Sequence, residues 1–192
     1  MKAFLMAALV LVPASAMAAQ ADYVVDPAAS KVEWVGKKVT GQHNGSIAVK
    51  SGSVKLNGNK LVGGRFSIDM TSIQCADLTD AEYNKKLIGH LESDDFFSSA
   101  KYNEATLVVK SVKERASDVE INGDLTIKGT TLPISFPAKI IAGADKISAT
   151  GKMLIDRTKY GIKYGSGRFF QNLGDKMIND QFELSFSLIA KK

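Results

Sequence analysis

The chain has 192 residues, a formal net charge of +5 at neutral pH and a single cysteine, Cys75. A single cysteine cannot form an intramolecular disulfide, so packing and sheet hydrogen bonds must stabilise the fold. The lysines are scattered among acidic residues and form no basic stripe, which argues against a nucleic-acid partner. We expect Cys75 to be a buried or half-buried residue without a function, and a reactive thiol is the alternative.

Residues 1–18 have the pattern of a secretory signal peptide. A short positive start precedes an apolar run over residues 3–12, and Ala16-Met17-Ala18 has the small residues of a cleavage site. The run is well below the roughly 20 apolar residues that span a bilayer. We therefore expect an exported protein that is cleaved after Ala18 or Ala19, folds as a single domain over residues 19–192 and does not insert stably into a membrane.

After this leader, apolar and polar residues alternate with a period of two, which is typical of strands with one buried face. The alternation predicts strands within residues 30–37, 53–70, 118–129, 146–156 and 181–190. Asn57-Gly58 predicts a hairpin turn inside the second of these ranges. Asn122-Gly123 is compatible with another turn, but the unbroken alternation around it favours one long strand.

The strands are long, have one apolar face each and are joined by short connections, which predicts an all-β antiparallel meander. Such a sheet must close into a barrel or pack against a second sheet. Four glycines lie in mid-strand in phase with the apolar face: Gly36, Gly64, Gly123 and Gly151. They either bend the sheet or leave room for a ligand, and both explanations require a closed sheet. We therefore expect a barrel of about eight strands.

One amphipathic helix interrupts the strands between residues 77 and 97. Thr79 and Glu82 have the spacing of a capping box, which predicts Thr79 as the N-cap. The apolar stripe of the helix consists of Tyr83, Leu87, Ile88 and Leu91. Residues 93–97 resemble a second, shorter helix start that Phe96 and Phe97 would anchor. We expect this segment to close or line one mouth of the barrel, and packing against the outside of the sheet is the alternative.

Motifs of catalysis are not found: the chain has no nucleophile elbow, no P-loop and no complete dinucleotide-binding glycine motif. Its two histidines, His43 and His90, lie in different predicted elements, and with Cys75 they are fewer ligands than a zinc site usually has. We therefore expect no catalytic residues, no metal and no cofactor. The alternatives are a metal bound by these residues and an enzyme that uses His43 or His90 as a base.

Asp156 and Arg157 are adjacent at a predicted strand end. We expect them to form a structural ion pair. The alternative is that Arg157 meets the anionic head group of a ligand.

Five stretches of the chain together resemble the YceI-like family, in matching order. They are residues 23–47, 63–73, 87–97, 123–137 and 156–165, and "DLTIKG" and the "HL-S-DFF" pattern around His90 are the most specific parts. The resemblance implies a lipocalin-like antiparallel barrel, exported to the periplasm, that binds a polyisoprenoid or isoprenoid-quinone chain inside, and it makes a homodimer plausible. It implies no catalytic residue set. Ile88-Gly89 stand where family members often have an Arg-Asp pair, which is a departure from the pattern.

The inward residues of the predicted strands are the expected ligand lining. They are Trp34, Phe66, Ile68, Met70, Leu125, Ile127, Met153, Ile155, Leu184 and Phe186, with Phe96 and Phe97 near the mouth. We expect a periplasmic binding or carrier protein that holds an isoprenoid lipid against these side chains. The alternatives are an enzyme or sensor acting on a lipid or quinone on the same scaffold, and a passive interaction scaffold whose interior is filled by these side chains.

Overall fold

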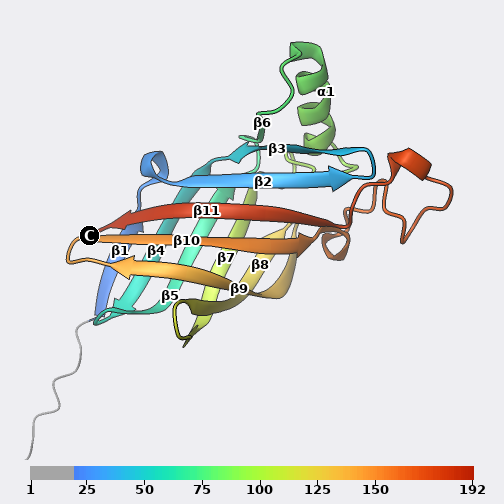
Figure 1. Ribbon diagram of the computed structural model, residues 1–192. Helices are drawn as coiled ribbons and strands as arrows, with labels where there is room; N and C mark the ends of the chain where they lie inside the picture. The colour runs from blue at the N-terminus through green and yellow to red at the C-terminus, as the bar shows by residue number, and fades with distance from the viewer. Residues whose placement is uncertain (1–19) are drawn as a thin grey trace, which may run out of the picture.

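The computed structural model describes residues 20–192, and the predicted signal peptide with its cleavage site lies outside the described residues. The chain folds into strands with one α-helix and three short 3-10 helices (Figure 1). In chain order these are β1 (Gln20–Val25), η1 (Pro27–Ala29), β2 (Lys31–Lys38), β3 (Gly41–Ile47), β4 (Val49–Asn57), β5 (Lys60–Asp69), β6 (Gln74–Cys75), α1 (Ala81–Glu92), β7 (Glu104–Glu114), β8 (Val119–Ile127), β9 (Thr130–Ala142), β10 (Lys146–Asp156), η2 (Arg157–Tyr160), η3 (Gly174–Lys176) and β11 (Gln181–Lys191).

The strands form a closed, antiparallel barrel of eight strands. The order around the barrel is β1-β4-β5-β7-β8-β9-β10-β11, and β1 pairs with β11 to close it. β2, β3 and β6 continue the same sheet beyond β11. The predicted fold class, a lipocalin-like antiparallel barrel of about eight strands with one inserted helix, is confirmed.

β1 and β2 follow each other along the same edge of β11. Val25 of β1 pairs with Ala190, and Lys31 of β2 pairs with Ser187. The break between them begins at Asp26, whose carboxylate caps η1 by accepting from two backbone N–H groups, and Pro27 starts the 3-10 turn. Because of this break, β2 bends away from the line of β1. The sheet of β2, β3 and β6 then extends the barrel beyond its closed section.

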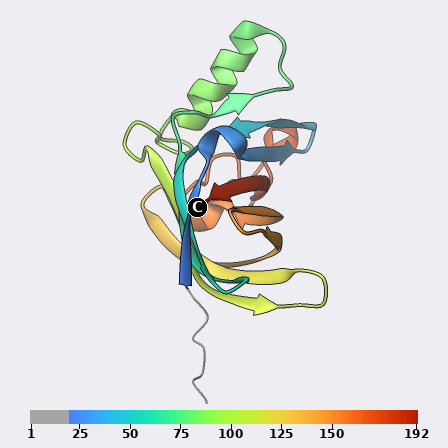
Figure 2. The same cartoon turned by 90° about the vertical axis from the view of Figure 1, so that its left-hand side faces the viewer.

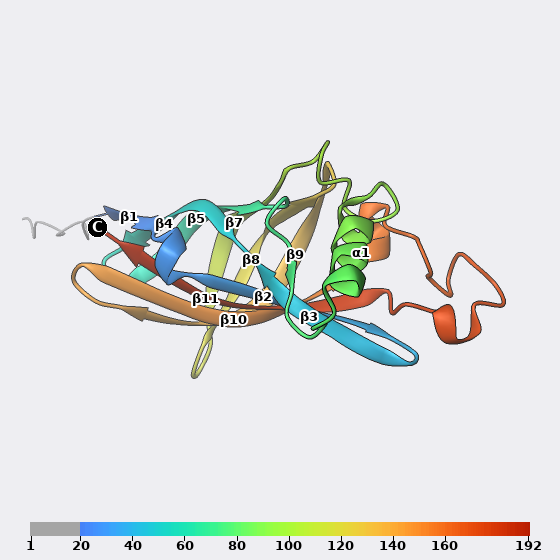
Figure 3. The ribbon, with the colours of Figure 1, turned by 90° about the horizontal axis from the view of Figure 1, so that it is seen from above.

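Apolar side chains fill one end of the barrel and surround a cavity toward the other. The filled end lies near both termini of the described chain (Figure 3) and contains Tyr23, Val25, Val54, Leu56, Ile147 and Ala190, all of them buried. Leu56 and Ile147 are 1% and 2% exposed, so this end is closed to water. Any route into the interior must therefore lie at the opposite end, where α1 and the β10–β11 connection are found.

The helix stands out from the barrel instead of lying across its mouth (Figure 2). None of its residues is buried, and the side chain of Tyr83 is 65% exposed. Leu87 and Leu91 are half-buried and face the barrel interior, whereas Ile88 packs against the core beside them. Only the C-terminal half of the predicted apolar stripe therefore packs against the barrel.

The N-cap of α1 is Asp80, so the prediction of Thr79 is wrong by one residue. The Asp80 carboxylate accepts hydrogen bonds from the backbone N–H groups of Glu82 and Tyr83, at 2.9 and 3.0 Å. A carboxylate has the additional advantage of a negative charge at the positive end of the helix dipole, which the threonine hydroxyl does not have.

Residues 93–97 form turns, and the predicted second helix is not present. The backbone N–H of Ser98 donates to the carbonyl oxygen of Ser93 at 2.9 Å, and that of Phe96 donates to the same oxygen at 3.1 Å. Ser98 itself has a positive φ of 49°, which ends the turn. The turn places Phe96 and Phe97 against the barrel. None of the helices in residues 20–192 has the length and apolar character needed to cross a bilayer.

Candidate functional site

The barrel contains an apolar cavity of about 360 Å³. Its wall is made by inward side chains of β2, β3, β4, β5, β7, β8, β9, β10 and β11, and by α1 and the turn that follows it. Almost all of the lining is aliphatic or aromatic, and the volume lies within the range of small-molecule sites. The interior is thus partly hollow and suited to a nonpolar guest.

Eleven of the twelve predicted lining residues face this cavity. They are Trp34, Phe66, Ile68, Met70, Phe96, Phe97, Leu125, Ile127, Met153, Leu184 and Phe186. Ile155 does not line the cavity: it is 2% exposed and packs in the surrounding core cluster.

Several lining residues were not among the predicted ones. They include Val32, Ile47, Leu107, Val109, Phe136, Phe182 and Leu188. Most lie on strands outside the predicted strand ranges, where the same period-two pattern continues, such as Leu107 and Val109 on β7. The aromatic residues contact one another across the wall: the Phe136 and Phe186 rings are edge-to-face at 5.9 Å, and those of Phe97 and Phe182 at 6.2 Å.

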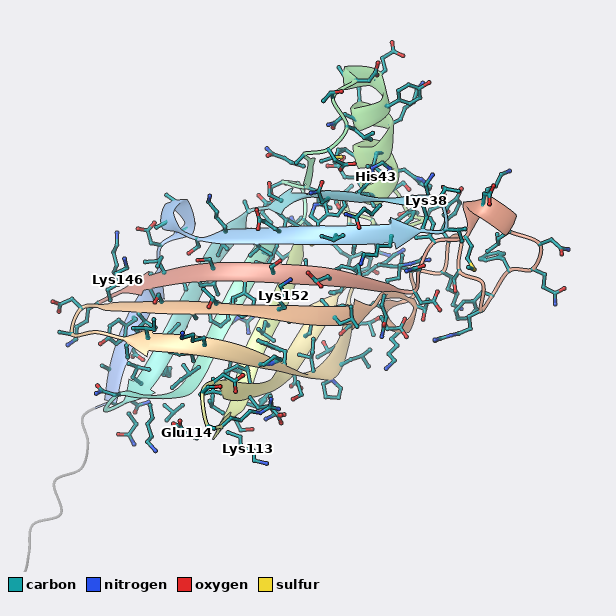
Figure 4. All side chains as sticks on the ribbon, in the orientation of Figure 1. Lys38, His43, Lys113, Glu114, Lys146 and Lys152 are labelled. Carbon is teal, nitrogen blue, oxygen red and sulfur yellow. The ribbon has the colours of Figure 1, made fainter. Side chains whose placement is uncertain are left out.

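The cavity reaches solvent at the end opposite the chain termini. Lys37, Lys38, Asn179 and Gln181 are exposed and still belong to the cavity lining. Figure 4 shows Lys38 at the end from which α1 rises. We call these four residues the polar rim. The predicted position of the helical segment at a barrel mouth fits this arrangement, because α1 and the turn after it supply apolar residues beside the rim.

The four inward glycines do not have one common role. A Cβ atom on Gly36 would have a single neighbour within 4.0 Å, a ring carbon of Trp34, so this glycine leaves open space in the cavity wall. A Cβ atom on Gly123 would lie 2.5 Å from the carbonyl oxygen of Val108, and one on Gly151 would lie 2.7 Å from that of Pro137. A Cβ atom on Gly64 would lie similarly close to the carbonyl oxygen of Ser53. The last three therefore allow backbone strands to approach closely, and only Gly36 provides room.

Arg157 is buried beside the cavity and organises the β10–β11 connection. Its guanidinium donates four hydrogen bonds of 2.8–3.1 Å to backbone carbonyl oxygens. The acceptors are Ile162, Tyr164, Ile178 and Asn179. The side chain also lies over the Phe96 ring, at 5.8 Å from its centroid. Arg157 therefore has a structural role, as predicted. Its partners are backbone carbonyl oxygens and not the predicted carboxylate of Asp156.

The prediction of an ion pair between Asp156 and Arg157 is wrong. Asp156 instead accepts from the hydroxyl of Thr158 at 2.6 Å and faces Arg168 at 3.5 Å, whereas the nearest carboxylate to Arg157 is that of Asp180, at 4.0 Å. Asp156 ends β10 and its carboxylate caps η2, whereas Arg157 is the first residue of η2 and turns its guanidinium toward the carbonyl oxygens of the β10–β11 connection.

The two histidines occupy different environments. The His90 ring is edge-on to both Phe96 and Tyr164, with centroids at 4.8 and 4.6 Å, and it does not line the cavity. His43 does line the cavity, and its Nδ1 lies 2.8 Å from Oδ2 of Asp77 (labelled His43 in Figure 4). His43 is thus the histidine that a molecule in the cavity would meet.

Asp77 is the centre of a small polar cluster at this place. Burial opposes its ionised form, but hydrogen bonds from the Asn44 backbone N–H, the His43 ring and the Cys75 thiol outweigh burial and lower the pKa of Asp77 to about 2. Burial is also the main reason why the pKa of the Cys75 thiol is raised. Asp77 is therefore a carboxylate over the physiological range, and Cys75 is a half-buried thiol, as the sequence analysis expected of its burial.

The barrel is similar to solved structures of low sequence identity. A crystal structure of BcnA from Burkholderia cenocepacia matches 87% of this chain and 99% of that chain, with a TM-score of 0.67 and 24% identity. A polyisoprenoid binding domain from Saccharophagus degradans matches 91% of this chain and 98% of that chain, with a TM-score of 0.64 and 17% identity. At these identities the likeness shows a shared fold.

Sequence relatives point to one family. Protein YceI of Escherichia coli O17:K52:H18 is 42% identical over 79 residues, which are 41% of this chain and only 38% of that protein's length. UPF0312 protein Shewana3_1179 of Shewanella sp. (strain ANA-3) is 30% identical over 185 residues, covering 87% of this chain and 91% of that protein. The family described as "YceI-like domain" matches residues 23–190. The chain therefore belongs to the YceI-like family.

Proposed function

We propose that the protein is an exported, periplasmic binding protein that carries an isoprenoid lipid or an isoprenoid quinone in its barrel. One observation carries the proposal: an apolar cavity of about 360 Å³ that opens to solvent at a polar rim. The structural neighbour from Saccharophagus degradans, named a polyisoprenoid binding domain, supports the class of ligand.

The energetics of such a site require few polar contacts. Burial of hydrocarbon contributes roughly 0.8 kcal/mol per carbon, so one isoprene unit contributes about 4 kcal/mol before the costs of ordering are subtracted. Two or three buried units would already give useful affinity on this scale. A lining without a recognisable polar motif is therefore what this function needs.

The distribution of polar groups gives the guest an orientation. The far end of the barrel is filled, and the polar rim of Lys37, Lys38, Asn179 and Gln181 is at the open end. A lipid would insert its chain first and leave its head group among the rim side chains, because a buried polar head group without hydrogen bonds is costly.

Trp34 is a reporter for occupancy of the cavity. It is the only tryptophan of the chain, it lines the cavity, and its indole N–H donates to the carbonyl oxygen of Gln74 at 3.1 Å. Ubiquinones of increasing chain length quench tryptophan emission through their head group. We expect saturable quenching with one quinone per protein, and tighter binding as the isoprenoid chain grows.

A matched control moves the reporter to the outer face of the barrel. Leu154 lies on β10 between two inward residues and is 61% exposed. In the double variant Trp34→Phe, Leu154→Trp the tryptophan should not respond saturably to the quinone. Equal quenching of the inner and outer reporters, or no dependence on chain length, would contradict the proposal.

Export and self-association are separate parts of the proposal, supported by the leader pattern and by the family. Fractionation of host cells should place the protein in the periplasm, and intact-mass measurement should show that residues 1–18 or 1–19 have been removed. Recovery of an uncleaved chain from the cytoplasm would refute export. The homodimer stays a prediction, which analytical ultracentrifugation tests.

A further inference from the structure

Three side chains with metal-binding atoms meet at the wall of the barrel near its open end. They are His43 on β3, Cys75 on β6 and Asp77 two residues further on. The Nδ1 of His43 is 2.8 Å from Oδ2 of Asp77, and the Sγ of Cys75 is 3.3 Å from Oδ1 of Asp77. One ligand atom from each residue lies within 4.8 Å of the other two.

The fold holds this cluster in place with backbone hydrogen bonds. β3 pairs with β6 in a register that sets Gly45 opposite Cys75, and a side chain at Gly45 would collide with the backbone of Gln74. The Asn44 backbone N–H donates to Oδ1 of Asp77 at 2.8 Å. The end of β6 is tied to α1, because the Asn84 side-chain amide donates to the carbonyl oxygen of Cys75 at 3.0 Å.

We propose that His43, Cys75 and Asp77 form a binding site for a divalent transition-metal ion, with Zn²⁺ as the ion that fits the donor set. One imidazole nitrogen, one thiolate and one carboxylate oxygen are ligands that Zn²⁺ accepts, whereas Ca²⁺ and Mg²⁺ require oxygen ligands. The Asn44 N–H holds Oδ1 of Asp77 and so leaves Oδ2 directed at His43 as the metal ligand.

The geometry needs a small adjustment at His43 and Asp77 and an approach of the Cys75 Sγ, because the three ligand atoms lie within 4.8 Å of one another and ligands of one Zn²⁺ ion are about 3.3–3.5 Å apart. With Zn–N and Zn–O distances of about 2.0 Å, two ligands of a tetrahedral site are separated by about 3.3 Å. The His43 to Asp77 distance is 2.8 Å, so these partly exposed side chains must move apart by a few tenths of an ångström. Binding replaces the hydrogen bond between them, and the Cys75 thiol releases its proton to solvent as the thiolate forms the metal bond.

Three protein ligands leave a fourth position for water or another molecule. His43 belongs both to this cluster and to the cavity lining, so the ion would lie in the cavity wall near the polar rim. The proposal does not depend on lipid binding, because every ligand atom comes from the protein itself.

The test uses reduced, chelator-treated protein that carries no polyhistidine tag. The protein is titrated with ZnCl₂ in a calorimeter and, separately, with CoCl₂ in an absorption spectrometer. We expect one ion per chain, and a thiolate-to-cobalt charge-transfer band from Cys75. The variants His43→Gln, Cys75→Ser and Asp77→Asn should each bind Zn²⁺ at least tenfold more weakly. His90→Gln is the matched control, since His90 lies outside the cluster, and it should bind as the unaltered protein does.

These variants keep a polar group at each position, and thermal unfolding of the metal-free proteins checks that they fold. The cobalt spectrum of the unaltered protein tests the thiolate ligand even where a variant is unstable. Three results would overturn the proposal: no saturable Zn²⁺ binding, a cobalt complex without the thiolate band, or equal affinity in all four variants.

Discussion

A Cβ atom on Gly123 would lie 2.5 Å from the carbonyl oxygen of Val108 on the neighbouring strand, which is closer than a carbon and an oxygen can approach. The two strands are β7 and β8, and their register shifts by one residue just beyond this point, between Val109 and Ser111. The glycine therefore belongs to a bulge that bends the barrel wall, and the backbone cannot give way cheaply.

We expect Gly123→Ala to lower the free energy of unfolding by about 1–3 kcal/mol, the usual cost of forcing extra atoms into a packed site. Urea unfolding measures this change. Gly63→Ala is the matched control, because a Cβ there meets no atom within 4 Å. An unchanged urea midpoint in Gly123→Ala would show that the strands can separate without cost.

Gly36 provides the opposite test. Its added Cβ would meet only a ring carbon of Trp34 at 4.0 Å, so Gly36→Leu should extend into the cavity and occupy the space of the guest. We expect at least a tenfold loss of isoprenoid binding, measured by equilibrium dialysis of labelled farnesol, with a change in unfolding free energy of no more than about 0.5 kcal/mol. Gly63→Leu should leave binding unchanged; undiminished binding by Gly36→Leu would argue against this cavity as the binding site.

Arg157 should be essential for the order of the β10–β11 connection. Arg157→Lys removes most of the four hydrogen bonds to backbone carbonyl oxygens, and buried acceptors without donors are costly. We expect a loss of about 3 kcal/mol in unfolding free energy and faster proteolysis within residues 161–180. Arg168→Lys is the control, since its side chain is more than half exposed, and it should cost less than about 1 kcal/mol. Equal effects of the two changes would contradict this assignment.

The stability contributed by Asp156 should depend on pH. Burial disfavours its charge, but the hydroxyl and the backbone N–H of Thr158 donate to the carboxylate and Arg168 lies nearby, so its pKa is lowered overall. The folded pKa is then below the unfolded value of about 3.9. The stabilisation is complete above the unfolded pKa and is lost as the pH falls through the folded pKa.

Asp156→Asn should therefore be less stable than the unaltered protein at pH 7, and the difference should shrink below about pH 4. Urea unfolding over this pH range is the measurement. Thr158→Val, which removes the hydroxyl donor, should shift the loss of stability to higher pH. A difference between Asp156→Asn and the parent that is constant down to pH 3 would contradict the lowered pKa.

The sequence was sufficient for the barrel and for most of its inner wall because one rule, the period of two, places alternate residues on the same face of a strand. The hairpin at Asn57-Gly58 and the unbroken β8 across Asn122-Gly123 are both confirmed. Ile155 shows where the rule stops. It is inward, but it lies near the end of β10, where side chains pack against the β10–β11 connection instead of the hollow.

β9 shows a different limit of what the sequence predicts. It contains Pro133 and Pro137, which sequence reasoning does not favour in the middle of a sheet. In the barrel β9 pairs with β8 along most of its length but with β10 only from Ala138 onward. Both prolines thus lie where one edge of the strand is unpaired, and a proline nitrogen that points to that edge gives up no sheet hydrogen bond.

The cluster of His43, Cys75 and Asp77 could not be predicted at all, because 34 residues separate His43 from Asp77 in the chain. The expectation of no metal rested on the two histidines and Cys75, and it did not include the carboxylate of Asp77. Only the pairing of β3 with β6 brings these side chains together.

The most direct test of a lipid-filled barrel is mass spectrometry of the protein purified from its own host, first intact under native conditions and then after extraction with organic solvent. We expect one isoprenoid lipid or quinone per chain, released on unfolding and present in a smaller amount in Gly36→Leu. A protein that is repeatedly empty, and that also takes up no added isoprenoid, would contradict it.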